Sequence, residues 1–180
     1  MPRYVALLRG INLGGHTVKM VHLAGLFEKL GFKNVETFIA SGNVIFESPS
    51  KDIAALEKKI ETHLEKSLGF PALTFLWTDA ELAQVAEHPL YESSAEHPVY
   101  IGFLKTKPSA ASKAKLLTYQ SKHDEFHVTE REAYWLCRKK GMSESDFFRV
   151  GLDKALGMPV TVRNTTTIRK LVAKYPARRG

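Results

Sequence analysis

The sequence has a single cysteine, no long apolar run and, in residues 154–180, no acidic residue. One cysteine, Cys137, excludes an internal disulfide and a zinc cage built on thiolates. The longest early apolar run, Tyr4–Leu8, is shorter than the ~7–15 residues of a signal-peptide core or the ~20 of a membrane span. We therefore expect a cytoplasmic protein without a membrane segment.

Two common kinds of site are also missing. The seven histidines are scattered, with His16 alone and His88 and His97 on either side of a proline-containing stretch, so we expect no metal site. Residues 10–17 fall one residue short of the P-loop pattern, because His16 stands where the phosphate-binding lysine belongs. A P-loop also needs a parallel sheet, whereas this sequence indicates hairpins. We therefore reject a nucleoside triphosphatase, and no motif identifies a cofactor.

The positive charge is concentrated at the C-terminus. Residues 1–153 carry equal numbers of basic and acidic residues, so the whole net charge of +7 lies in residues 154–180. Residues 1–27 also lack acids. Such basic regions attract phosphates, nucleic acids or other anions. The alternative is a solvated helix face with a frayed basic tail, and for Arg178 and Arg179 we expect the frayed tail. The basic residues concerned are Lys154, Arg163, Arg169, Lys170, Lys174, Arg178 and Arg179.

Hydrophobic periodicity predicts an α+β fold in two similar halves. Strands are expected at 4–9, 35–40, 44–47 and 73–77, with helices at 20–30 and 53–69. This βαββαβ order is typical of a ferredoxin-like antiparallel sheet with both helices packed on one face, and the same order returns over 99–162. We predict two tandem ferredoxin-like halves, 1–87 and 99–180, with a linker at 88–98 and a basic helix at the C-terminus.

Several boundary signals accompany these elements. Ser50 is expected to cap the second helix, and Ser145 to open a helix that ends at Gly157. Residues 78–81 match a capping box, and Ser41–Asn43 matches a tight hairpin turn. Asn164 stands at the N-cap of the last helix.

The first candidate site is the loop after the first strand. In βαββαβ topology the end of the first strand and the turn before the third strand share one sheet edge. Arg9 is expected to pair with an anion, the backbone of Gly14 and Gly15 to hold it, and Asn12 to orient it. The alternative is an ordinary tight corner with Asn12 as a helix cap. The predicted ligand-binding residues are Arg9, Gly10, Asn12, Gly14, Gly15, Lys19, Ser41 and Asn43.

The second candidate site is Arg163–Thr167, where a strand leads into a helix. The first helical turn offers free N–H groups and three hydroxyls, with Arg163 and Asn164 beside them, which suits a phosphate or carboxylate. The alternative is an Asn164 cap with threonines at surface positions. The sequence leaves open whether this segment approaches the first site.

Two further interpretations receive less weight. Cys137 lies in a predicted strand with Trp135, so we expect it in the core, although the basic residues after it leave a reactive thiol open. Sheets of this topology also bind RNA on exposed aromatic residues. No segment has the signature of such domains, so these aromatics are expected to be buried. They are Phe38, Phe46, Phe75, Trp77, Phe126 and Trp135.

Three segments, Tyr4–Gly15, Asn34–Phe46 and Thr161–Leu171, resemble a widespread bacterial family known as domain of unknown function 1697. The resemblance extends over nearly the whole chain. It implies a fold of two ferredoxin-like halves and leaves the activity open. The third segment departs from the family pattern, which usually has tryptophan where this chain has Thr165. If that indole stacks on a ligand in the family, binding differs here.

The leading hypothesis is therefore a protein that binds a small phosphate- or carboxylate-bearing ligand, with an enzymatic role left open. One alternative is a nucleic-acid-binding module that uses residues 154–180. Another is a structural or oligomerising domain that has no ligand. No catalytic residue is predicted.

Overall fold

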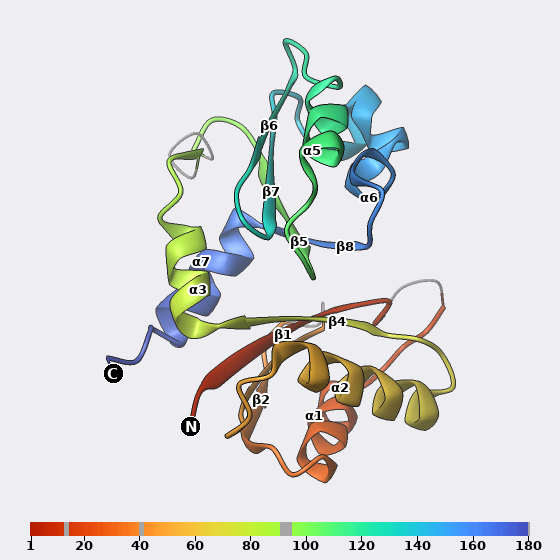
Figure 1. Ribbon diagram of the computed structural model, residues 1–180, viewed down its shortest axis with the longest axis vertical. Helices are drawn as coiled ribbons and strands as arrows, with labels where there is room; N and C mark the ends of the chain where they lie inside the picture. The colour runs from red at the N-terminus through yellow and green to blue at the C-terminus, as the bar shows by residue number, and fades with distance from the viewer. Residues whose placement is uncertain (13–14, 40–41, 91–94, 180) are drawn as a thin grey trace. The chain divides into compact units, whose positions relative to one another are not determined.

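The computed structural model describes residues 1–12, 15–39, 42–90 and 95–179. It divides into two compact units (Figure 1). Unit 1 is Met1–Glu81 together with the C-terminal residues from Arg178, and unit 2 is Leu82–Ala177. The predicted boundaries 1–87, 88–98 and 99–180 stay predictions. No helix among the described residues is long and apolar enough to cross a membrane.

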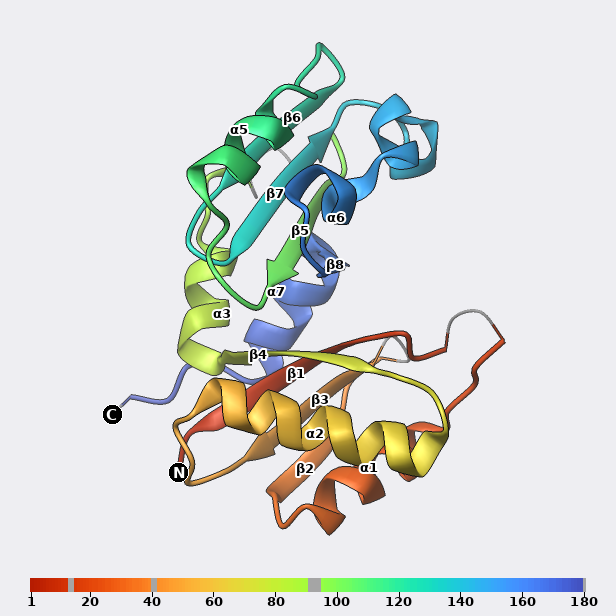
Figure 2. The same ribbon diagram turned by 45° about the vertical axis from the view of Figure 1, so that its right-hand side comes forward.

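Unit 1 contains one four-stranded antiparallel sheet and two helices on the same face of it (Figures 1 and 2). The strand order is β2-β3-β1-β4, so the first and third strands lie side by side as predicted. The elements are β1 (Arg3–Arg9), α1 (Met20–Lys29), β2 (Lys33–Thr37), β3 (Asn43–Glu47), α2 (Ile53–Leu68) and β4 (Leu73–Thr78).

Unit 2 repeats this arrangement with the strand order β6-β7-β5-β8. The predicted α+β fold with two ferredoxin-like halves is therefore confirmed. Helix α3 (Asp79–Ala86) connects the two sheets in sequence. The remaining elements are β5 (Val99–Leu104), α5 (Ala110–Leu117), β6 (Asp124–Val128), β7 (Glu132–Cys137), the short 3-10 helices Met142–Glu144 and Asp146–Arg149, α6 (Gly151–Leu156), β8 (Val160–Asn164) and α7 (Thr165–Lys174).

The apolar strand β1 is buried on both faces. Tyr4, Ala6 and Leu8 pack with the residues of α1 and α2, whereas Val5 and Leu7 point to the opposite face and are also buried. A strand covered on both sides has no polar alternation, which is why this segment is a continuous apolar run. In unit 2, α5 and α6 cover one face of the sheet through Leu116, Leu152 and other apolar residues.

The free edge of β4 is closed by glutamates. Glu61 accepts the Thr74 N–H at 2.8 Å, and Glu57 accepts the Leu76 N–H at 3.0 Å. Glu81 then accepts the N–H of Thr78 at 2.8 Å. Unpaired strand edges attract other strands, so these carboxylates remove three donors from an otherwise open edge.

Some predicted boundaries were wrong. The cap of α2 is Asp52, whose side chain accepts the Ala55 N–H, and not Ser50. The helix predicted from Ser145 to Gly157 is broken, because Gly151 takes a left-handed φ of 76° and α6 begins only there. Strand β2 is Lys33–Thr37 and not 35–40 as predicted, and the predicted turn at Ser41–Asn43 lies partly outside the described residues. Ser145 does cap the 3-10 helix Asp146–Arg149.

Candidate functional site

The loop after β1 and the turn before β3 meet at one corner of sheet 1. Strand β1 ends at the half-buried Arg9, and the preceding Leu8 N–H donates to the Gly42 carbonyl at 2.8 Å. The topological prediction that the two segments share a sheet edge is therefore confirmed. We call Arg9–Asn12 together with Gly42–Asn43 the β1 corner.

Two glycines allow the β1 corner to close. Gly10 has a φ of 91°, and a Cβ atom there would lie 3.2 Å from the Pro71 carbonyl. Gly42 has a φ of 80°, and its Cβ would lie 3.2 Å from the Cβ of Leu8 and 3.3 Å from that of Ile11. Both positions combine a left-handed backbone with close contact, so any larger residue at either position would be strained.

The backbone of Ile39, three residues before Gly42, is strained. Ile39 is β-branched and half-exposed, yet its φ is 58°. This conformation is a genuine outlier for a β-branched residue and costs about 1–3 kcal/mol. Asn12, on the opposing loop, is also left-handed with a φ of 57°. Strain of this kind persists only where the surroundings enforce it, and it tends to gather at functional sites.

The two asparagines of the β1 corner hold its backbone. Asn12 Oδ1 accepts the Val18 N–H at 2.7 Å, which folds the loop back before α1. Asn43 is fully buried, and its Nδ2 donates to the Phe38 carbonyl at 2.8 Å. These contacts make both residues positioning groups. Direct contact of either with a ligand stays a prediction.

The remaining residues of the first predicted site are only partly described. Lys19 is exposed and stands at the N-cap of α1, where no side chain caps the helix and the first turn carries no acid. Gly15 is exposed with a φ of 84°, and the neighbouring His16 stacks on Phe70 at 4.0 Å between ring centroids. Gly14 and Ser41 lie outside the described residues.

The second predicted site belongs to unit 2. Arg163 is 8% exposed, and burial lowers the pKa of its guanidinium to about 10. Its NH1 donates to the Thr161 hydroxyl and to the Val162 carbonyl, each at 2.9 Å. Asn164 Oδ1 accepts the Thr167 N–H at 2.8 Å, so the predicted N-cap is confirmed. The Arg163 side chain therefore donates to groups of its own strand, and the Asn164 side chain caps the start of α7.

A hollow of about 300 Å³ opens beside this helix start. We call it the α7 hollow. Thr165, 5% exposed, and the exposed Thr166 belong to the first turn of α7. Tyr100, which pairs with Asn164 in the sheet, also lines the hollow, and its hydroxyl accepts the Met142 N–H at 3.3 Å. Sequence reasoning missed this side of the hollow because residues 96–98 were assigned to a linker and residues 99–100 to the start of a strand. The lining consists of Glu96, His97, Pro98, Val99, Tyr100, Asn164, Thr165 and Thr166.

The core of unit 2 contains polar groups with a structural role. Asp124 is buried and accepts from Trp135 Nε1 at 2.8 Å and from the Ser145 hydroxyl at 2.8 and 2.9 Å. Cys137 is buried, and burial raises the pKa of its thiol, so the expected core position holds and the thiolate is disfavoured. Within the described ranges no cluster of three or more His, Cys, Asp or Glu residues is arranged to hold a metal ion.

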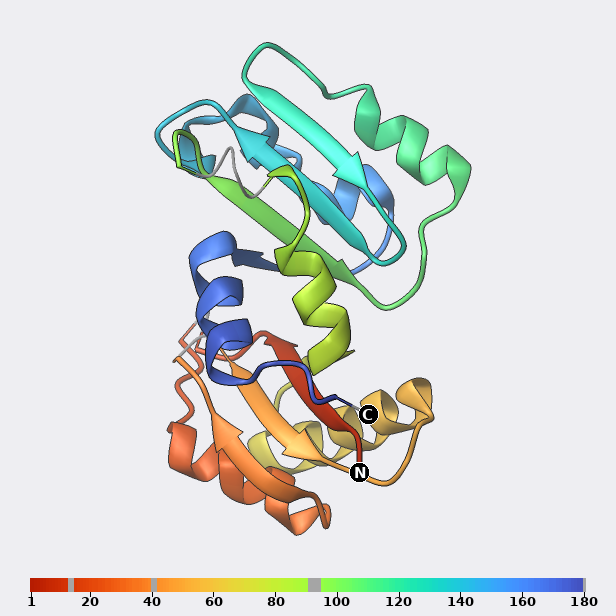
Figure 3. The same cartoon turned by 90° about the vertical axis from the view of Figure 1, so that its left-hand side faces the viewer.

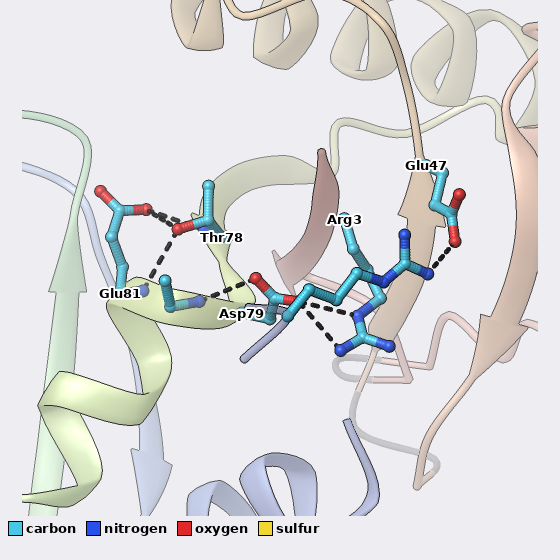
Figure 4. A network of polar contacts seen from close by, with 7 residues as sticks. Arg3, Glu47, Thr78, Asp79 and Glu81 are labelled. Atoms are coloured by element: carbon cyan, nitrogen blue, oxygen red, sulfur yellow. Dashed lines mark hydrogen bonds and ion pairs between the residues drawn. The ribbon is translucent and has the colours of Figure 1, made fainter. Parts of the chain in front are cut away.

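A polar network anchors the start of α3 and the C-terminus (Figure 4). Arg3 donates to Asp79 Oδ2 from Nε at 3.1 Å and from NH2 at 2.9 Å. The predicted capping box is present, since the Glu81 N–H donates to the Thr78 hydroxyl. Arg178 forms an ion pair with Glu47, and the last described residues lie close to the start of β1 (Figure 3). The expectation that Arg178 belongs to a frayed tail was wrong.

Of the six aromatics considered for RNA stacking, five are buried. Only Phe38 is half-buried. The sheets therefore present no aromatic platform of the RNA-binding kind among these residues. The buried ones are Phe46, Phe75, Trp77, Phe126 and Trp135.

Comparison with known proteins identifies the family and a similar fold. The model of a family described as "Protein of unknown function (DUF1697)" matches residues 1–134, so the chain belongs to this family. No curated protein matches the sequence. The structure of the conserved bacterial protein SP0830 from Streptococcus pneumoniae is similar, with a TM-score of 0.78 and 24% sequence identity over 98% of this chain and 99% of the other. At that identity the likeness concerns the fold alone.

Proposed function

We propose that this DUF1697 protein binds a small phosphate- or carboxylate-bearing ligand at the β1 corner. The observation that carries the proposal is the strained backbone of Ile39 at a turn bonded directly to the strand that ends in Arg9. A β-branched residue in a left-handed conformation costs about 1–3 kcal/mol. A turn whose only role is to connect two strands gains nothing from that cost, whereas a preorganised binding loop does.

The chemistry of the corner suits an anion. Arg9 supplies a permanently charged guanidinium, whose planar fork matches carboxylate and phosphate oxygens. The first 27 residues of the sequence, which include Arg9 and Lys19, contain no acid. The N-terminus of α1 begins at Lys19 without a side-chain cap, so its first N–H groups add positive potential. We assign Asn12 and Asn43 the role of holding the two loops in place.

The α7 hollow is a second proposed location for the same class of ligand. Its volume of about 300 Å³ is at the lower end of the range for small-molecule sites. The hydroxyl of Thr166 and the first N–H groups of α7 are anion donors, while Glu96 places one acid in the lining. A ligand in this hollow therefore carries a donor group as well as an anionic one.

The test is thermal stabilisation by a panel of anions: inorganic phosphate, sugar phosphates, nucleotides and small carboxylic acids. We expect at least one anion to raise the melting temperature of the wild type and to have no such effect on Arg9→Ala. Arg149→Ala removes an exposed arginine of unit 2 and should respond like the wild type. Arg9→Lys keeps the charge without the fork, so partial stabilisation is expected.

The apo protein provides the internal control. If Arg9 serves a ligand, Arg9→Ala shifts the apo melting temperature by no more than the ~2–4 °C that corresponds to 1 kcal/mol in a chain of this size. A large apo loss would identify Arg9 as a structural residue. Absence of stabilisation by every anion in the panel would favour the structural or oligomerising alternative.

The alternative of nucleic-acid binding depends on exposed basic residues in 154–180, and several of these residues are buried or have a partner within the protein. Arg163 is buried, Arg178 is paired with Glu47, and Lys174 lies over the ring of Tyr175 at 5.1 Å. Binding through the rest of this region would weaken steeply with salt, because counterions are released. Our proposal predicts no retention of short oligonucleotides on a filter at low salt. We include a cytoplasmic location in the proposal, supported by the low cysteine content.

A further inference from the structure

His88 attaches the chain segment after α3 to the sheet of unit 2. Its ring stacks on that of Tyr134 in β7, with centroids 3.9 Å apart and planes 16° from parallel. Its Nδ1 accepts the Leu90 N–H at 3.3 Å. Leu90 is buried. The His88 imidazole therefore stacks on a side chain of the sheet and also holds the backbone at Leu90 through a hydrogen bond.

The hydrogen bond specifies the protonation state of His88. A nitrogen that accepts an N–H carries no proton, so the neutral ring has its proton on Nε2. Once protonated, both ring nitrogens become donors. The Leu90 N–H would then face another donor and lose its partner. Loss of this partner by a partly buried N–H destabilises the attached segment.

The charged groups around His88 come from the two strands beside it. On β6, the His127 ring lies 6.1 Å from that of His88, and its Nε2 contacts Glu125 Oε1 at 2.7 Å. Arg138 donates to the other oxygen of that carboxylate at 2.6 Å. On β7, Glu132 acts on His88 with the opposite sign to His127. Glu125 thus contacts both Arg138 and His127. The charge of a protonated His127 still opposes protonation of His88, because the two rings lie close together.

We propose that His88 is a pH-sensitive latch, which holds residues 87–90 on the sheet of unit 2 when neutral and releases them when protonated. The release is driven by loss of the Leu90 hydrogen bond and by repulsion from His127. Tyr134 takes no part in the titration, because burial raises the pKa of its phenol above the ordinary value. The latch needs no ligand and does not depend on the proposed anion site.

The direction in which the pKa of His88 is shifted supports this latch. Burial lowers the pKa of His88, repulsion from His127 lowers it further, and Glu132 opposes both. A histidine whose folded pKa is depressed stabilises the folded segment fully above its unfolded pKa of about 6.5. That stabilisation is lost as the pH falls through the lower, folded pKa. Release is therefore expected on the acid side of pH 6.5 and not on the alkaline side.

The experiment is amide hydrogen exchange of the full-length protein at pH 7.5 and 5.0, corrected for intrinsic exchange rates. We expect protection of the Leu90 amide to fall about tenfold at pH 5.0, the order of effect expected when the N–H loses its hydrogen-bond partner. His88→Phe keeps a ring to stack on Tyr134 but cannot titrate, so its protection at Leu90 should be the same at both pH values. Equal protection in the wild type at both pH values would overturn the proposal.

The coupling to His127 supplies a second, independent readout. In His127→Gln the repelling charge is gone, so the midpoint of the pH-dependent loss should move to higher pH than in the wild type. A side chain with only a structural role would not move that midpoint. If His88→Phe does not fold, an NMR titration of His88 in the wild type decides. A value at or above 6.5 contradicts the latch, and a value below it supports the latch.

Discussion

The carboxylate of Glu57 on α2 accepts the backbone N–H of Leu76 on β4 at 3.0 Å, although both residues are buried. The contact joins a helix to the outer edge of a sheet, where a strand normally leaves N–H groups free. Together with Glu61 and Glu81 it closes the β4 edge. This edge therefore does not offer the row of open donors to which an extended peptide would add.

Glu57→Ala should destabilise the protein by roughly 2 kcal/mol, because it leaves the Leu76 N–H buried without this acceptor. Glu57→Gln keeps a carbonyl oxygen at the same place and should lose much less. The free energies of unfolding come from urea denaturation followed by circular dichroism. Equal losses in the two variants would mean that the charge of Glu57, and not its acceptor oxygen, matters to the fold.

The contact between Leu76 and Glu57 shows which features the sequence could predict and which it could not. Leu76 lies in an apolar run and Glu57 in an amphipathic helix, and both elements were predicted from spacing alone. The βαββαβ order then leaves few possible sheet topologies, because the connections between strands follow strict rules. The hydrogen bond between them depends on the height of α2 over β4. That height is set by packing, so no local pattern encodes it.

A second prediction concerns the ion pair of Arg178 with Glu47. The hydrogen bond from Arg178 is the main cause that lowers the pKa of Glu47, and a hydrogen bond from Asn34 adds to it. A carboxyl group with a lowered folded pKa contributes stability above its unfolded value of about 4.3, and this is lost as the pH falls through the folded pKa. Arg178→Ala should raise the Glu47 pKa and flatten this acid dependence.

The pKa of Glu47 can be followed by NMR titration of its carboxyl carbon. Arg179→Ala is the matched control, since Arg179 is the exposed neighbour in the same segment. It should leave the Glu47 pKa where it is in the wild type. A Glu47 pKa that stays low in Arg178→Ala would assign the shift to Asn34 and not to the C-terminal arginine.

A third prediction separates close packing from backbone strain at the β1 corner. Gly42 and Gly69 have nearly the same φ, 80° and 82°, but a Cβ at Gly69 meets nothing within 4 Å. Gly69→Ala should therefore cost only the left-handed backbone, about 1–2 kcal/mol. Gly42→Ala adds contacts with Leu8 and Ile11, so it should cost more than Gly69→Ala. Urea denaturation of both variants measures the difference in free energy of unfolding. Equal losses would show that Leu8 and Ile11 move aside without further cost.

The β1 corner itself was only partly predictable. Glycine content and topology were sufficient to place Arg9 beside the Gly42 turn. The roles of Asn12 and Asn43 were not, because an asparagine in a glycine-containing loop is equally suited to a ligand and to a backbone contact. Here their amides bond Val18 and Phe38. The strain at Ile39 had no local signal, since isoleucine rarely takes a positive φ.

The last prediction distinguishes the two proposed anion locations. Thr165 is buried and lines the α7 hollow, so Thr165→Trp should fill the hollow with an indole while leaving the Asn164 cap of α7 intact. If the stabilising anion binds in the hollow, this variant should lose the thermal stabilisation, whereas Arg9→Ala should keep it. If the anion binds at the β1 corner, the two variants should behave in the opposite way.

The matched control is Thr165→Ser, which keeps the hydroxyl and the open hollow and should respond like the wild type. Circular dichroism and the apo melting temperature show whether Thr165→Trp folds, because a large side chain at a buried position costs typically 1–3 kcal/mol when it overpacks. Stabilisation that survives in both Thr165→Trp and Arg9→Ala would contradict both locations. Because the substitutions lie in separate units, loss in only one of them identifies the unit that holds the ligand.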